Sequence, residues 1–401
     1  MKMALETAND WRLNESMKKL AAVLCAALAA QISAFACSAF LLKGDSYHVI
    51  GFNENWSYLP GMVVVNKRGH VKHNLSWSDL VAAQPSSPQL SWTAKYGSVT
   101  FNVFGIDLPC YGMNEPGLFI AELALDKTYS TVDSSRPRMF WAQWIQFQLD
   151  NYDTVEAVVQ HLSEAPLIDW WPHFEGSHFF VTDAQGRTAA IEFIDGKLAV
   201  STAERMPQPI LCNGRYQDEL AALGRYQGFG GDTLFNSNSI PWKDRFITIA
   251  HRLKEYRPET ATPSDFAWKL LDEVRAGVWQ VVADERSRRL EFRSKASSRI
   301  KSINLADCDF SANSPIRFLD IHINFKGNIA PHLANWTPQI NRAYTLAGFP
   351  AGYDKDALYQ SEDYTHLQEN LLDYAEQLER QTKTAGDSAQ TAKGNASGHA
   401  P

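Results

Sequence analysis

The segment from Met17 to Cys37 constrains the fold most, because it indicates where the folded chain begins. Two lysines follow Met17, an apolar stretch covers Leu20–Ala30, and Ala34-Phe35-Ala36 precedes Cys37. A basic start, a short apolar region and a small-residue end are typical of a secretory signal peptide. The apolar stretch is too short to span a bilayer comfortably. We therefore predict that residues 1–36 are a signal peptide removed by signal peptidase, and that the protein is periplasmic or secreted.

Three other interpretations of this segment are open. The first sixteen residues are polar, which is unusual for a signal peptide, so Met17 is an alternative start of translation. A lipid-modified cysteine is less favoured, because Ala34 stands where such sites usually have a leucine-like residue. A buried N-terminal helix is also less favoured, because the lysines and the small-residue end fit export better.

The chain after Cys37 is rich in strand-like runs, which are apolar, β-branched or aromatic and are bounded by turn residues. These runs cover 38–42, 47–53, 61–69, 96–105, 117–125, 178–200 and 278–295. Turns are predicted within 178–200 at Gln185-Gly186 and Asp195-Gly196. Helical periodicity occurs at 138–150, 154–163, 242–256, 263–274 and 363–380. Because strands and helices come in groups with little βαβ alternation, we predict an α+β fold with antiparallel sheets.

The domain organisation follows from the absence of any internal linker. No stretch rich in Gly, Pro or Ser divides the chain before its end, so residues 37–380 are predicted to form one catalytic domain. Residues 381–401 are small, polar and without periodicity. They are predicted to form a disordered tail.

Charge and ligand spacing argue against several partners and cofactors. The formal charge of −7 and the pI near 5.9 provide no basic surface for nucleic acid or an anionic membrane. Cysteines and histidines lack metal-ligand spacing, so no metal ion and no cofactor are expected. Pairing among Cys110, Cys212 and Cys308 stays open, although buried thiols are the favoured interpretation. A homo-oligomer is compatible with the sequence but not indicated by it.

A cysteine at the start of a mature chain carries two reactive groups. Its thiol is a nucleophile, and its own α-amino group, with an unperturbed pKa of about 7.7–8.0, is a base tethered beside it. This proximity makes a separate histidine base unnecessary. Cleavage directly before Cys37 would therefore produce an N-terminal nucleophile.

Four segments resemble, in order, the motifs of the choloylglycine hydrolase and penicillin V acylase family of linear-amide hydrolases. The opening CSAFLLKGDSYHVIGFNENW (37–56) is similar to the family's cysteine, short hairpin and Gly-Arg-Asn-x-Asp. GMNEPGLFIAEL (112–123) resembles the second motif, Gly-Met-Asn-Glu-x-Gly-Leu. ILCNG (210–214) and KDRF (243–246) follow where the family has an asparagine after a short strand and Ser-Arg-Phe before a helix. The resemblance implies an αββα four-layer sandwich of the N-terminal-nucleophile hydrolase type.

The resemblance also implies roles for particular residues. Cys37 matches the nucleophile, and Asn213 matches an asparagine whose side-chain amide stabilises the developing oxyanion. Arg245 matches an arginine that holds the polar network of the site together. The expected reaction is hydrolysis of the C–N bond of a small-molecule N-acyl amide through a thioester on Cys37. Asn213 as an ordinary turn residue and Arg245 as a surface arginine are the alternatives.

Two departures from the family motif bear on activity. Phe52 stands where the family has arginine, and Asn55 where it has the aspartate that anchors the α-amine. Because side chains alternate along a strand, Glu54 is expected to point to the opposite face. Asn55 is therefore expected to orient the amine without charge assistance, and loss of the arginine should make the thiolate harder to form. A family asparagine is also replaced by Ala124. These changes predict a slow enzyme or a different local network.

Other functions remain open on the sequence. Acyl transfer to a second amine would use the same cysteine, and a non-catalytic envelope protein could keep the same fold. Glu122 lies in a strongly apolar run, where a carboxylate needs a partner, and either lines the pocket or pairs with an arginine. Bile-salt conjugates, phenoxyacyl β-lactams, acylated signals and small peptides all fit the substrate class.

Overall fold

A computed structural model describes the chain from residue 37 to residue 396, with gaps. The described ranges are 37–55, 60–84, 88–125, 135–169, 176–238, 244–274, 277–351 and 362–396. Residues 36–401 form one compact unit. The predicted signal peptide, residues 1–36, and the alternative start at Met17 lie outside the described residues.

The first sheet has seven strands in the order β14-β1-β2-β15-β16-β17-β19. Its members are β1 (Ser38–Gly44), β2 (Tyr47–Glu54), β14 (Ile210–Leu211), β15 (Trp279–Asp284), β16 (Arg289–Ser294), β17 (Ser297–Asn304) and β19 (Gly327–Asn328). All pairs are antiparallel except β17 with β19. The hairpin β1–β2 lies between β14 and β15 and is built from the apolar runs on either side of the Asp45-Ser46 turn. It carries Cys37 at its open end.

The second sheet has nine strands in the order β13-β12-β11-β8-β7-β6-β3-β18-β20, all antiparallel. They are β3 (Met62–Asn66), β6 (Ser98–Asn102), β7 (Pro109–Asn114), β8 (Phe119–Ala124), β11 (Ser177–Thr182), β12 (Thr188–Ile194), β13 (Lys197–Thr202), β18 (Arg317–Asp320) and β20 (Ala334–Asn335). Asp195 and Gly196 both have positive φ, 51° and 74°, at the tight turn between β12 and β13. This Asp-Gly turn was predicted from the sequence.

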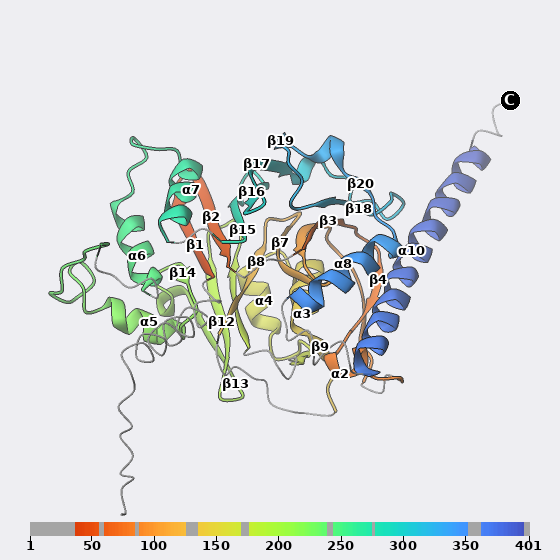
Figure 1. Cartoon of the computed structure of the whole chain (residues 1–401), viewed down its shortest axis with the longest axis horizontal. Helices are drawn as coiled ribbons and strands as arrows, with labels where there is room; N and C mark the ends of the chain where they lie inside the picture. The colour runs from red at the N-terminus through yellow and green to blue at the C-terminus, as the bar shows by residue number, and fades with distance from the viewer. Residues whose placement is uncertain are drawn as a thin grey trace, which may run out of the picture. The chain divides into compact units, whose positions relative to one another are not determined.

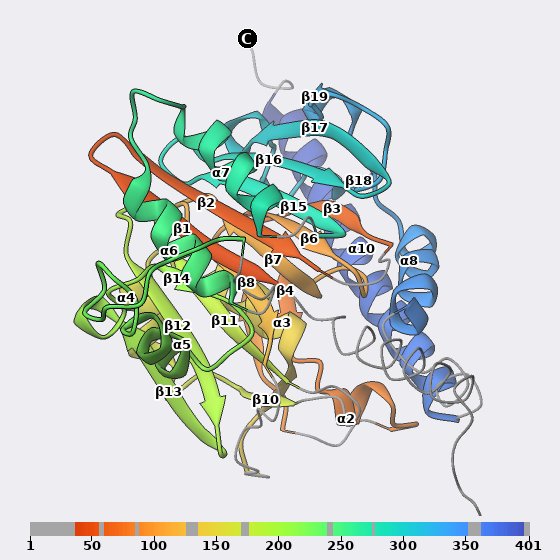
Figure 2. The ribbon, with the colours of Figure 1, turned by 60° about the vertical axis from the view of Figure 1, so that its left-hand side comes forward.

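The two sheets pack face to face through aromatic side chains. Phe52 on β2 lies 4.7 Å from Tyr111 on β7, and Phe292 on β16 lies 5.2 Å from Phe101 on β6, between ring centroids. Helix α3 (Trp141–Asn151) covers β7 and β8 of the second sheet. Helices α6 (Arg245–Glu255) and α7 (Pro263–Glu273) cover β1, β2, β14 and β15 of the first (Figure 1 and Figure 2). This order of layers confirms the predicted αββα sandwich.

Shorter elements lie at the edges of the sandwich. Strands β4 (Val71–His73) and β5 (Ser91–Thr93) form one small sheet, and β9 (Arg138–Phe140) and β10 (Leu167–Asp169) form another. The remaining α-helices are α2 (Trp77–Leu80), α4 (Val155–His161), α5 (Tyr216–Leu223), α8 (Pro338–Ala351) and α10 (Glu362–Ala396). Sequence patterns did not indicate α2, α5 or α8. No helix in the described ranges is both long and apolar enough to cross a membrane.

The C-terminal helix is longer than the sequence suggested. Residues 381–401 were predicted to be disordered, but α10 continues to Ala396, so this prediction is wrong for residues 381–396. The physical reason begins with Gln381, whose side chain accepts from Val71 N and donates to Val71 O, both at 2.8 Å. These bonds fix the helix to the free edge of β4, and the next turns extend a helix that is already nucleated. Residues 397–401 lie outside the described residues.

Candidate active site

Cys37 lies immediately before β1 and is buried, with 2% of its surface exposed. Its Sγ donates a hydrogen bond to Glu54 Oε1 over 3.8 Å. The backbone N–H of Asn55 also donates to this sulfur. The thiol is therefore surrounded by the end of β2, the neighbouring strand.

Glu54 does not point away from the cysteine, which corrects the expectation from strand alternation. Ser38 pairs with Asn53 in the β1–β2 register, so the next pair along the hairpin is Cys37 with Glu54. Directly opposite residues in an antiparallel pair share one face of the sheet. The expectation assumed that Asn55 continues the strand. Because β2 ends at Glu54, the alternation of side chains does not extend to Asn55. The side chain of Asn55 is buried, and its Nδ2 has no hydrogen-bond partner in the described chain.

Arg245 joins the nucleophile to the predicted amide donor. It is the first residue of α6 and is 5% exposed. Its Nε donates to Ser38 Oγ at 3.0 Å, and its Nη2 donates to Cys37 O at 3.2 Å and to Asn213 Oδ1 at 2.6 Å. The planar guanidinium thus fixes Cys37 and Asn213 relative to one another, which a surface arginine would not do.

Asn213 lies just after β14 and accepts from Arg245 through its Oδ1. Its Nδ2 donates one hydrogen bond to Ala124 O at 2.6 Å, which leaves the second amide hydrogen for another acceptor. Glu219 on α5 holds the following turn, since its Oε1 accepts from Gly214 N at 3.3 Å. A Cβ on Gly214 would lie 2.8 Å from Glu219 Cγ, so a larger residue at this position would have to displace the Glu219 side chain.

Two buried carboxyl groups shape the electrostatics around Cys37. Burial raises the pKa of the Cys37 thiol well above its usual value, and the charges of Glu54 and Glu122 raise it further, while the Asn55 amide and Arg245 oppose this. Burial also raises the pKa of Glu122 to about 7, although a hydrogen bond from the Ser177 hydroxyl acts in the opposite direction. The charge of Glu122 therefore acts on the Cys37 thiol. The hydrogen-bond partner of Glu122 is a serine rather than an arginine.

Phe52 occupies an apolar position. Its side chain has no exposed surface and packs on Tyr111 between the two sheets. Phe52 carries no charge where the family motif has an arginine. Loss of that positive charge is expected to raise the pKa of the Cys37 thiol, and the pKa of this thiol is indeed raised. The thiol of the uncleaved chain is thus held in its neutral form.

Two histidines in or beside strands are bonded to backbone carbonyls, and the described cysteines form no disulfide. His178 is buried between Glu192 and Cys212 O, and the Nδ1 of His48 bonds to Ala184 O. Cys37, Cys110, Cys212 and Cys308 are all unpaired. Within the described ranges, no group of three His, Cys, Asp or Glu side chains is arranged to hold a metal ion.

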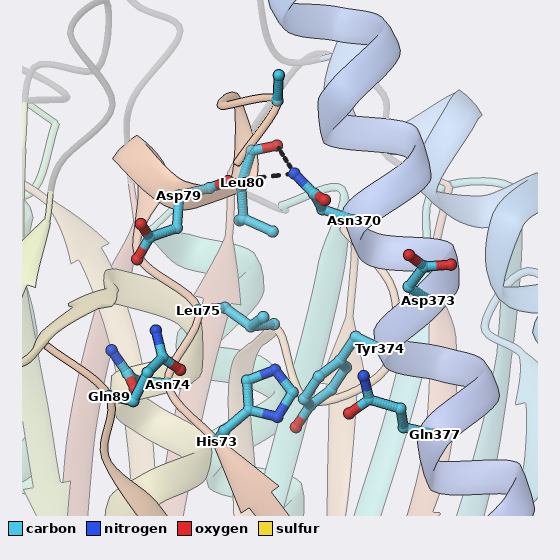
Figure 3. A pocket seen from close by; sticks show the side chains of 11 residues that line it. His73, Asn74, Leu75, Asp79, Leu80, Gln89, Asn370, Asp373, Tyr374 and Gln377 are labelled. Carbon is cyan, nitrogen blue, oxygen red and sulfur yellow. Dashed lines mark hydrogen bonds between the residues drawn. The ribbon is translucent and has the colours of Figure 1, made fainter. Parts of the chain in front are cut away.

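A cavity of about 600 Å³ lies elsewhere, between α10 and the β4–α2 segment (Figure 3). Its lining is mixed, and some of its polar side chains are bonded to backbone. Asn370, for example, donates to the carbonyls of Asp79, Leu80 and Ala82 at 3.0–3.1 Å. None of the residues that line this cavity is Cys37 or a hydrogen-bond partner of Cys37, so the cavity lies outside the candidate site. It lies where α10 packs against the β4–α2 segment.

The structure thus brings Cys37, Asn213 and Arg245 into one hydrogen-bonded group and places Asn55 next to it through its backbone. Sequence reasoning missed Ser38, Glu219 and the orientation of Glu54. Ser38 and Glu54 could have been found by pairing the two strands of the hairpin from its turn. Glu219 carried no local signal, because its role depends on α5 packing against the loop after β14.

Comparisons with known proteins bear on the family and the fold of this chain. The model of the linear amide C–N hydrolases, choloylglycine hydrolase family, matches residues 37–248. Penicillin V acylase from Pectobacterium atrosepticum is 25% identical over 265 residues, which are 55% of this chain and 69% of the relative. Among solved structures, penicillin V acylase from Agrobacterium tumefaciens has a TM-score of 0.62 and 22% identity, covering 75% of this chain and 98% of that one. A conjugated bile acid hydrolase variant from Clostridium perfringens has a TM-score of 0.55 and 18% identity, covering 71% and 96%. At these identities the solved structures show a shared fold.

Proposed function

Because this chain belongs to the choloylglycine hydrolase family of linear amide C–N hydrolases, we propose that it cleaves the amide bond of a small N-acyl compound with Cys37 as an N-terminal nucleophile. The observation that carries the proposal is the Arg245 guanidinium, which holds the backbone of Cys37 and the side-chain amide of Asn213 in one hydrogen-bonded group. The match to the family model begins at Cys37, which supports cleavage before this residue.

The proposed reaction has two stages. The α-amino group takes the thiol proton, the sulfur attacks the acyl carbonyl, and the free amide hydrogen of Asn213 donates to the oxyanion. The C–N bond then breaks as the α-ammonium group returns its proton to the leaving amine, and a thioester remains. Water attacks the thioester, gives one proton to the α-amine and releases the acid, after which the thiol is restored.

Maturation and location form part of the proposal. A free α-amine on Cys37 requires removal of residues 1–36, and the export signal predicted there supplies the cleavage site. The mature enzyme is then periplasmic or secreted. Penicillin V and conjugated bile acids belong in the substrate panel because they occur in the names of a relative and of a structural neighbour.

The test is expression of the full chain in an exporting host, followed by mass spectrometry of the mature protein and release of free amine from an N-acyl panel. We expect the protein to begin at Cys37, and Cys37→Ala to lose turnover by about a thousandfold or more. Cys308→Ala is the matched control, because Cys308 is only part-buried and contacts Asn304 O. A different N-terminus, or unchanged turnover of Cys37→Ala, would contradict the proposal. Products formed with added amine would identify acyl transfer instead.

A further inference from the structure

Glu54 is a buried acid that has no cationic partner among the residues that the structure describes. It is 3% exposed, its Oε1 accepts from the Cys37 thiol, and its Oε2 has no hydrogen-bond partner in the described ranges. Burial and the charge of Glu122 raise its pKa well above the usual value, whereas the hydrogen bond from Cys37 acts in the opposite direction. Buried polar atoms in folded proteins nearly always have a hydrogen-bond partner, so the free acceptor atom of Glu54 calls for an explanation.

Cleavage before Cys37 would create such a partner at this point. The α-nitrogen of Cys37 is three bonds from Sγ, and Sγ already contacts the Glu54 carboxyl group. In the uncleaved chain this nitrogen is an amide with one hydrogen. After cleavage it is an amine that can carry a positive charge and donate several hydrogen bonds.

We propose that Glu54 is the positioning residue of the mature N-terminus, with its carboxylate accepting a hydrogen bond from the α-amino group of Cys37. This inference rests on the proposed function, because the α-amine exists only if the chain is cut before Cys37. It assigns to Glu54 the role that the sequence motif had suggested for Asn55. Asn55 contacts the sulfur through its backbone N–H instead.

The charged groups around the α-amine determine whether loss of the Glu54 charge raises or lowers the pKa of this amine. Glu54 on β2 and Glu122 on β8 both favour the ammonium form, whereas Arg245 on α6 disfavours it. Burial raises the pKa values of Cys110 and Tyr111 on β7 well above their usual values, so both are neutral near pH 7. Removing the Glu54 charge should therefore lower the pKa of the α-amine.

The experiment measures that pKa directly in mature protein, by NMR titration of isotope-labelled cysteine. We expect Glu54→Gln to lower the α-amine pKa by about one unit or more, because an opposite charge at this range shifts a pKa by that amount. The low-pH limb of the turnover profile should move in the same direction. Glu54→Asp, whose carboxylate is one methylene further away, should lie between the two. Asn55→Ala should leave the α-amine pKa near that of the parent protein.

The outcomes separate this inference from the proposed function. A mature chain that starts at another residue would contradict the proposed function, and the inference would fall with it. If the chain starts at Cys37 and turnover needs Cys37, but Glu54→Gln keeps the parental α-amine pKa, the function stands and the inference is wrong. A shift in Asn55→Ala alone would give the role to Asn55. If Glu54→Gln fails to fold, an unchanged pKa in folded Glu54→Asp would contradict the inference.

Discussion

At the scale of single residues, the site depends on one planar side chain that reaches three acceptors. The Arg245 guanidinium donates to Ser38 Oγ, Cys37 O and Asn213 Oδ1 within 3.2 Å, and these groups lie at the start of β1 and just after β14. An arginine presents its donors in a fixed fork, whereas a lysine presents one compact charge. The geometry between nucleophile and amide donor is therefore expected to be sensitive to the shape of residue 245 as well as to its charge.

We predict that Arg245→Lys lowers kcat/KM about tenfold to a hundredfold, because the ammonium group keeps the charge but cannot make all three bonds. The change should appear in kcat rather than in KM, since the bonds position the reacting groups. Steady-state kinetics on the best N-acyl substrate measure this. Arg299→Lys, on the exposed face of β17, is the control. Equal kinetics for Arg245→Lys and the parent protein would show that charge alone suffices.

At the scale of elements, a buried ionic cluster joins β4 to α3 and α10. Lys72 Nζ lies 2.8 Å from Asp107 Oδ1 and 2.9 Å from Asp150 Oδ2. Tyr374 on α10 donates to Asp107 Oδ2 at 2.7 Å, and Trp92 on β5 donates to Asp150 Oδ2 at 2.8 Å. Burial alone would lower the pKa of Lys72, but the two aspartates raise it above its usual value. The cluster therefore holds a charged lysine in the interior and orients three elements around it.

Lys72→Met should lower the free energy of unfolding by roughly 3–5 kcal/mol at neutral pH, because it leaves two buried aspartates without their cation. Burial raises the pKa of Asp150 above its usual value, so the loss should shrink as the pH falls and Asp150 takes up a proton. Urea unfolding at several pH values tests both points. Lys383→Met is the control, since Lys383 forms an exposed pair with Glu379 on α10 and such pairs contribute little. A loss that does not depend on pH would contradict the role of the aspartate charges.

At the scale of the whole molecule, buried acids link stability to pH. Glu285 has no exposed surface, and its Oε2 accepts from Thr182 Oγ1 at 3.2 Å. Burial raises its pKa well above 4.5, the Thr182 bond opposes this, and Asp183 and Asp284 raise it further. Above pH 4.5 the unfolded chain loses this proton before the folded chain does. The folded state therefore binds more protons there, and stability falls as the pH rises through the folded pKa.

Glu285→Gln should therefore flatten the decline of Tm with rising pH above about 4.5, while leaving Tm near pH 4 almost unchanged. The glutamine amide has the same shape and does not ionise. Thermal unfolding followed by circular dichroism from pH 4 to pH 9 measures the slope. Glu376→Gln, at an exposed position on α10, should leave it unaltered. A parallel curve for Glu285→Gln and the parent protein would rule out this linkage.

Sequence alone was sufficient for the α+β class, the strands of the β1–β2 hairpin, the Asp195-Gly196 turn and the family. These depend on local periodicity, turn chemistry and the order of motifs along the chain. Tertiary structure decided the orientation of Glu54 and the length of α10. Glu54 faces Cys37 because cross-strand pairing sets its face, which alternation within one strand cannot show. Helix α10 persists past residue 380 because Gln381 binds the edge of β4, some three hundred residues earlier in the chain. Contacts between residues far apart in sequence carry no local pattern, so only the folded chain reveals them.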